Sequence, residues 1–187
     1  MHKILLLSGL WTFTFGVGVV FGQGANLGKP INPADIAMWD SDVEPSGAGL
    51  PASSGTAEQG APIFAEKCAL CHGVGGKNVA HMQNGAALAP RPLVSDAERV
   101  GIDESTATIR NYWQYSTTLF DFIRRGMPWT APGSLSDHEV YALTAYILAE
   151  NKLIDAKQEM NAQTLPKVEM PNRNGFINRF PKLTPPG

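Results

Sequence analysis

Cys68-Ala69-Leu70-Cys71-His72 is the stretch of sequence that decides which kind of domain this chain forms. It holds the only two cysteines of the chain, and a histidine follows the second one directly. On one helical turn both thiols lie on the same face, where each can add to one vinyl group of a haem as a thioether. The adjacent imidazole can then donate a nitrogen to the iron. The pattern predicts one covalent haem c, attached through Cys68 and Cys71, with His72 as an iron ligand.

Other uses of two cysteines fit this sequence less well. A structural zinc site needs four ligands, usually with a second Cys or His pair, whereas His2, His81 and His138 are scattered along the chain. A thioredoxin-like redox pair follows a strand, but an amphipathic helical pattern precedes Cys68. A disulfide between residues this close would close a very small loop and add little stability.

Residues 1–24 have the pattern of a secretory signal peptide. Lys3 is followed by an almost apolar run over residues 4–21, and small residues follow at Gly22, Gly24 and Ala25. The same run is about long enough to span a bilayer, so an uncleaved anchor is the alternative. In both cases the rest of the chain lies outside the cytoplasm. We expect it in the periplasm, which agrees with haem c attachment.

The composition bounds the size of the domain and the kind of partner. Without the leader, about 160 residues remain, which is one domain with extensions. The net charge is only −2, and no basic patch is interleaved with aromatic residues, so we expect no nucleic-acid partner. The 14 prolines and 19 glycines concentrate outside the central section and are too many for a plain helical bundle.

The chain divides into an extended lead-in over 25–55, a domain over 56–155 and a proline-rich tail over 156–187. In the lead-in, Asn32 as N-cap, Pro33 at the first helical position and Asp35 in the first turn predict a short helix that runs to Trp39. The lead-in is acidic and the tail is basic. The two segments are either solvated or lie on the domain or on a partner of complementary charge.

Three helices are predicted in the domain. The first ends in the haem motif and begins near Gln59, because Pro62 is tolerated only in a first turn. The second covers residues 116–125. The third opens with the capping box Ser136-Asp137-His138-Glu139 and runs to about Asn151. Its apolar positions have helical spacing: Val140, Leu143, Ile147 and Leu148.

A second axial ligand is expected from Met127. It follows Arg124-Arg125-Gly126 and precedes Pro128, in a loop ahead of the last helix. A thioether opposite histidine raises the reduction potential of a haem. The alternatives are that Met127 only packs in the core, or that His81 or Met82 binds the iron.

The imidazole of His72 also needs an acceptor for its second ring nitrogen, because metal-bound histidines usually donate that N–H to a carbonyl or a carboxylate. The segment Ala89-Pro90-Arg91-Pro92-Leu93 is placed to supply a backbone carbonyl. We expect it from Pro90 or Pro92.

Residues 57–151 resemble a class I cytochrome c domain. The resemblance rests on Gly60-x-x-x-Phe64-x-x-x-Cys68-x-x-Cys71-His72 and on Leu143-x-x-Tyr146. It implies an all-α class I cytochrome c fold of three to five helices around one covalent haem, here with extended N- and C-terminal segments. It also implies that the first and last helices cross closely at Gly60, which has no side chain.

The extensions are similar to those of the SoxD family, the cytochrome subunits of sulfane dehydrogenase (S-disulfanyl-L-cysteine oxidoreductase). The matching stretches include Leu27-Gly28-Lys29-Pro30, Arg124-Arg125-Gly126-Met127-Pro128 and Met170-Pro171-Asn172-Arg173-Asn174-Gly175-Phe176. This resemblance implies an electron-transfer subunit without a substrate site of its own. Its partner would be a molybdenum-cofactor dehydrogenase subunit, either SoxC-like or sulfite-oxidase-like, and a downstream acceptor would take the electrons.

Two alternatives to the sulfane dehydrogenase subunit stay open. Well-known SoxD proteins carry a second haem domain, whereas this chain has one C-x-x-C-H motif. The chain could therefore be the cytochrome subunit of a sulfite dehydrogenase, or a free-standing soluble electron shuttle.

Overall fold

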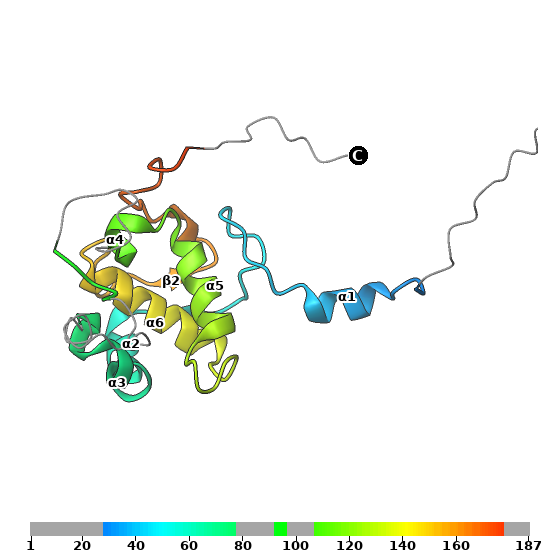
Figure 1. Cartoon of the computed structure of the whole chain (residues 1–187), viewed down its shortest axis with the longest axis horizontal. Coiled ribbons are helices and arrows are strands. Elements are labelled where there is room, and N and C mark those ends of the chain that lie inside the picture. Colours follow the sequence, from blue (N-terminus) through cyan, green and yellow to red (C-terminus); the bar gives the residue numbers. More distant parts are fainter. Residues whose placement is uncertain (1–27, 78–91, 97–106, 178–187) are drawn as a thin grey trace, which may run out of the picture.

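The computed structural model describes residues 28–77, 92–96 and 107–177. These residues are mostly helical, as predicted: α1 Pro33–Trp39, α2 Ala57–Lys67, α3 Ala69–His72, α4 Ile109–Tyr112, α5 Ser116–Gly126 and α6 Asp137–Glu150. Two 3-10 turns are present, η1 Val74–Gly76 and η3 Leu165–Lys167, and β1 Ser54–Gly55 pairs with β2 Met160–Asn161 in an antiparallel sheet. Figure 1 shows α2, α4 and α5 gathered around α6, while α1 extends away from them.

Helix α6 is the centre of the domain. Its capping box is present, since the Ser136 hydroxyl accepts from the Glu139 N–H at 3.3 Å and the Glu139 carboxylate accepts from the Ser136 N–H at 2.9 Å. The predicted apolar stripe is buried. The helix is buried on its other sides as well, through Tyr141, Ala142, Thr144 and Ala145. It is therefore enclosed by its neighbours rather than resting on them with one face.

Helix α2 begins earlier than predicted. It starts at Ala57 because Thr56 caps it: the Thr56 hydroxyl accepts from the Gln59 N–H, and the Gln59 side chain accepts from the Thr56 N–H at 2.9 Å. The expectation that Pro62 must lie in the first turn is wrong. Pro62 lies inside the helix on an exposed position, where water can satisfy the carbonyl that the proline leaves without its helical partner.

The close crossing of α2 and α6 at Gly60 is confirmed. A Cβ added at Gly60 would overlap the backbone carbonyl of Ala142 and lie 2.8 Å from the Cβ of Tyr146. One turn further along α2, the ring of Phe64 lies 4.9 Å from that of Tyr146, centroid to centroid. The two helices can approach this closely because position 60 carries no side chain.

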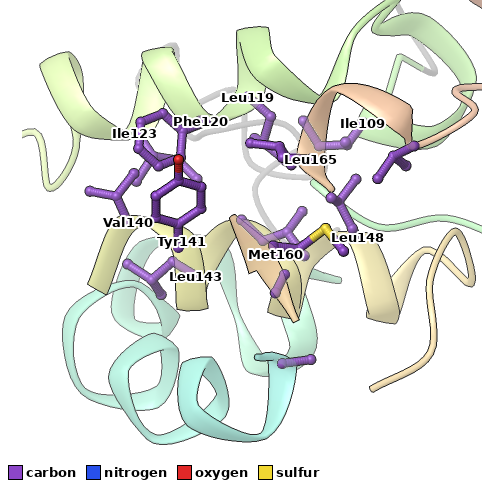
Figure 2. Close-up of a cluster of buried hydrophobic side chains, with 14 of the residues drawn as sticks. Ile109, Leu119, Phe120, Ile123, Val140, Tyr141, Leu143, Leu148, Met160 and Leu165 are labelled. Atoms are coloured by element: carbon purple, nitrogen blue, oxygen red, sulfur yellow. The ribbon is translucent and has the colours of Figure 1, made fainter. Parts of the chain in front are cut away.

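A second part of the core lies between α5, α6 and the residues that follow α6 (Figure 2). Phe120 and Tyr141 stack at a tilt with ring centroids 4.5 Å apart. Met160 from β2 and Leu165 from η3 are fully buried beside them. The hydroxyl of Ser116, at the start of α5, donates to the Leu165 carbonyl at 2.6 Å. The segment after α6 thus completes the hydrophobic core.

Parts of both extensions lie on the domain. The two-stranded sheet pairs Ser54 with Asn161, so the end of the lead-in touches the start of the tail. The Tyr141 hydroxyl donates to the Pro51 carbonyl at 3.0 Å, and Asp42 forms an ion pair with Arg125 at 3.0 Å. Residues 42–55 and 160–172 are therefore attached to the helices. The boundaries expected at residues 25, 56 and 156 stay predictions, and the expected leader over 1–24 lies outside the described residues.

Candidate functional site

The two cysteines and the histidine lie on one tight turn where α2 changes direction. The Cys68 N–H still donates to the Phe64 carbonyl at 2.9 Å, and the Cys68 carbonyl accepts from the His72 N–H at 2.9 Å. Cys68 is thus both the C-cap of α2 and the N-cap of α3. Gly73 ends the turn with a φ of +72°, a conformation that side chains disfavour.

The two thiols differ in exposure. Cys68 is half-buried and packs against the hydrophobic core, whereas Cys71 is exposed. Burial raises the pKa of the Cys68 thiol to about 11. Two thiols on one turn, one at the core and one at the surface, are placed to form two thioether bonds to one group.

His72 is placed as a neutral nitrogen ligand. Burial lowers the pKa of its imidazole, because a charged ring loses its hydration there. Its Nδ1 is buried and has no hydrogen-bond partner among the described residues. Pro92 is described and does not supply the expected carbonyl, while Pro90 lies outside the described residues. The buried Nδ1 is still the atom that a supporting acceptor would contact.

The chain beyond His72 is held in place by a backbone junction. The Gly76 carbonyl accepts from the N–H groups of Leu93 and Val94, at 2.8 and 3.2 Å. The side chain of Asn151, at the end of α6, donates to the Leu93 carbonyl at 3.1 Å and to the Ile147 carbonyl at 2.8 Å. The turn that carries His72 is therefore fixed to α6 from its C-terminal side.

Met127 lies directly after α5. Its N–H donates to the Ile123 carbonyl at 3.0 Å, and its side chain packs against the same hydrophobic core that Cys68 contacts. Arg124 beside it pairs with Asp137 at 3.4 Å, which ties the end of α5 to the start of α6. The structure brings Cys68, Cys71 and His72 onto one turn and supplies Met127 from another element of the same core. The competing ligands His81 and Met82 lie outside the described residues.

Two buried asparagines were not singled out from the sequence. Asn151 anchors the His72 turn as described, and Asn172 donates from Nδ2 to the Tyr112 carbonyl at 2.6 Å. Asn172 therefore holds the tail against the segment that leads into α5. An Asn followed by Arg-Asn-Gly predicts a turn and gives no signal of burial.

These residues fit a covalently bound haem. The donor set is two thiols and one neutral imidazole on a single turn. Large apolar side chains next to the candidate ligands are exposed: Leu70 by 93% and Val74 by 91% beside His72, and Trp129 by 71% beyond Met127. Exposed apolar groups of this size mark a binding surface.

A small helical domain built around one C-x-x-C-H turn defines a class of protein, the haem-binding electron carriers. The family model described as "Cytochrome c" matches residues 57–150, about half of the sequence. The chain belongs to the cytochrome c family, whose members carry covalent haem c.

One solved structure extends the similarity beyond that domain. It is the crystal structure of the sulfane dehydrogenase SoxCD from Paracoccus pantotrophus, with a TM-score of 0.71 and 29% sequence identity. The match covers 85% of this chain and 75% of that one. Since the family model covers residues 57–150 only, the similarity extends beyond that domain. The resemblance to SoxD inferred from the sequence is confirmed at this level. The comparison with curated proteins gave no match.

The search for membrane-spanning helices found none long and apolar enough in the described part of the chain.

Proposed function

We propose that this protein is a periplasmic electron-transfer subunit with a single haem c, attached at Cys68 and Cys71 and bound through iron by His72 and Met127. When bound, haem supplies one-electron chemistry at its iron. The protein's own contribution would be to hold the ring on the turn of Cys68 and Cys71, with the His72 imidazole and the Met127 thioether as the groups that would bind its iron. The placement of Cys68, Cys71 and the buried His72 on one C-x-x-C-H turn carries this proposal.

We further propose that the protein is the cytochrome subunit of a molybdenum-dependent sulfur-compound dehydrogenase, with a SoxC-like partner. The observation that supports this is the similarity to the sulfane dehydrogenase structure over 85% of the chain, which exceeds the cytochrome domain. Part of the tail completes the domain's own core, but a free-standing shuttle would not need the exposed apolar residues of the lead-in. The partner subunit oxidises the sulfur compound, and a downstream acceptor takes the electrons.

Haem attachment is tested by denaturing the purified protein in acid–acetone. Haem held by two thioethers stays with the polypeptide, and replacing both cysteines with alanine releases it. Extraction of haem from the unaltered protein would overturn the attachment. For the iron, Met127→Ala should remove the weak red-edge band of Met–Fe coordination and lower the reduction potential. An unchanged spectrum would assign the sixth position to His81 or Met82.

The subunit role is tested by co-purification and by reduction. The SoxC-like subunit of the source organism should co-purify with this cytochrome and reduce its haem when a sulfane substrate is added. Reduction with sulfite instead would assign the protein to a sulfite dehydrogenase. If neither substrate reduces the haem and the protein purifies alone, the soluble shuttle is the remaining alternative.

A further inference from the structure

The segment 28–41 differs from the rest of the structure because its apolar side chains are uncovered. Trp39 is 80% exposed, Ile31 57% and Ile36 47%. Ile36 and Trp39 are three positions apart on α1 and share one face of it. Ile31 and Ile36 occupy the positions before the N-cap and at the fourth helical residue, where apolar side chains meet each other across a helix start. The three side chains therefore form one apolar face.

The segment has no support from the domain. In the described residues its hydrogen bonds stay local, with Asn32 capping the Ala34 N–H at 3.0 Å and Asp40 donating to the Ile36 carbonyl at 2.9 Å. Figure 1 shows α1 standing apart from the helices. A helix of seven residues is too short to be stable alone in water. It needs a surface that covers its apolar face.

The attachment point of the segment is well defined. Asp42, the next residue, pairs with Arg125 in the last turn of α5, and Arg125 also pairs with Asp121. Arg125 precedes the candidate ligand Met127 by two positions. A partner that covers α1 would therefore lie near the end of α5, which Met127 follows directly.

We propose that residues 28–41 are an arm that docks on the SoxC-like subunit, a conclusion that rests on the proposed function. The match to the sulfane dehydrogenase structure covers 85% of the chain, so it extends beyond the cytochrome domain into the extensions. In this proposal the SoxC-like subunit presents an apolar pocket for Ile36 and Trp39. Basic residues at its rim face Asp35 and Asp40.

A second copy of the chain fits this arm poorly. Two arms paired about a two-fold axis would bring the acidic residues Asp35 and Asp40 of each copy together, and like charges repel. A seven-residue helix also offers far less than the roughly 800 Å² per partner of a standard interface. The rest of the interface must therefore come from elsewhere, as it does when an arm adds to a larger contact.

The test compares the full-length holo-cytochrome with a double variant, Ile36→Asp with Trp39→Asp. Binding to the purified SoxC-like subunit is measured by calorimetry, and haem reduction by that subunit with sulfane substrate is measured by stopped flow. We expect the double variant to bind roughly 30-fold more weakly, as for loss of an interface hot spot. Reduction at limiting subunit concentration should slow in proportion. Reduction by dithionite and the haem spectrum should be unchanged.

The matched control is Ile177→Asp, which adds a charge at another apolar side chain, 91% exposed, near the end of the described tail. It should change affinity by less than about twofold. An equal loss in this control would show that the effect is not specific to the arm and would overturn the proposal.

Hydrogen exchange separates the possible occupants. We expect the amides of α1 to exchange fast in the free cytochrome at every protein concentration and at least tenfold more slowly in the complex. Protection in the dilute free protein would mean that the arm folds onto its own domain. Protection that rises with protein concentration would mean a second copy. Either result would overturn the proposal.

Failure of the arm is distinguishable from failure of the proposed function. If the unaltered cytochrome is not reduced by the subunit, the subunit role fails. If it is reduced and the double variant binds equally well, only the arm fails.

Discussion

The two extensions of this chain look alike in sequence and behave differently in the structure. Both are rich in proline, and each carries a few large apolar residues between polar ones. In the tail, the apolar residues Met160, Leu165 and Met170 are buried in the domain. In the lead-in, residues 28–41 stand away from it, with Trp39 mostly exposed.

The difference shows that an extension can complete a core or be left for another surface, and that composition does not separate the two cases. The tail is held by side-chain to backbone contacts at sites far apart in sequence, such as Ser116 with Leu165 and Asn172 with Tyr112. The segment 28–41 has only local hydrogen bonds among the described residues. Four predictions test the contrast.

The largest effect is expected from truncation. Removing residues 160–187 deletes three buried side chains, Met160, Leu165 and Met170. Each buried Leu or Met contributes about 2–5 kcal/mol, so the loss exceeds about 5 kcal/mol and leaves little stability. Deleting residues 28–40 should change the free energy of unfolding by less than about 0.5 kcal/mol. Guanidinium unfolding of both holo-proteins measures this, and comparable losses would abolish the distinction between the extensions.

A matched pair of single substitutions gives the next effect. Leu165→Ala opens a cavity in the core and should cost about 3 kcal/mol. Trp39→Ala, although it removes a larger side chain, should cost less than about 0.5 kcal/mol in the isolated protein. The measurement is the denaturant midpoint at constant slope. A large loss for Trp39→Ala would place that side chain on the domain.

A smaller effect is expected at the anchor of the tail. Asn172→Ala removes the donor to the partly buried Tyr112 carbonyl and should destabilise the protein by about 1 kcal/mol. Asn174→Ala, at a neighbouring exposed asparagine, is the control. Hydrogen exchange should show faster opening of the tail alone in Asn172→Ala. Equal behaviour of the two variants would show that the tail is held by its apolar side chains only.

The smallest effect concerns an ion pair inside the domain. Glu139 accepts from Lys67 at 2.6 Å, which joins α6 to α2 and, with the Ser136 N–H, lowers the pKa of the carboxyl to about 2. A carboxylate whose pKa falls on folding stabilises the protein above its ordinary pKa of 4.5 and loses that contribution as the pH falls towards 2.

Glu139→Gln should therefore cost about 1 kcal/mol or less at pH 6, since the pair is partly exposed. The difference from the parent should shrink between about pH 4.5 and pH 2. Asp42→Asn, at the exposed pair that ends the arm, should cost less still. A constant difference across this pH range would mean that the charge of Glu139 does not contribute to stability.

Much of the fold could be predicted from local signals. Asn32 and Ser136 predicted the starts of their helices, because capping is a contact between near neighbours in sequence. The haem turn was predicted because its chemistry lies in five consecutive residues. Gly60 was placed correctly through the family resemblance.

One error concerned a local signal, and the rest of what the sequence did not show depends on contacts between distant segments. Pro62 was expected to mark the first turn of α2, but the Thr56–Gln59 box starts the helix earlier and the exposed face accommodates the ring. The roles of Asn151 and Asn172 could not be predicted, because a buried asparagine is recognised only through the distant carbonyl that it holds. The role of Met127 stays a prediction.

The pairing of β1 with β2 has a consequence for how this domain is assembled. The paired residues Ser54 and Asn161 stand before the first domain helix and after the last one. Contacts between such distant positions form late in folding, because the entropy of closing the long loop must be lost first. The helices can associate beforehand, and the sheet then closes the ends of the chain around them. A circular permutant in which a short linker joins the end of the described tail to the residues before β1, with new ends in a surface loop, would close a shorter loop to form this contact and should fold faster.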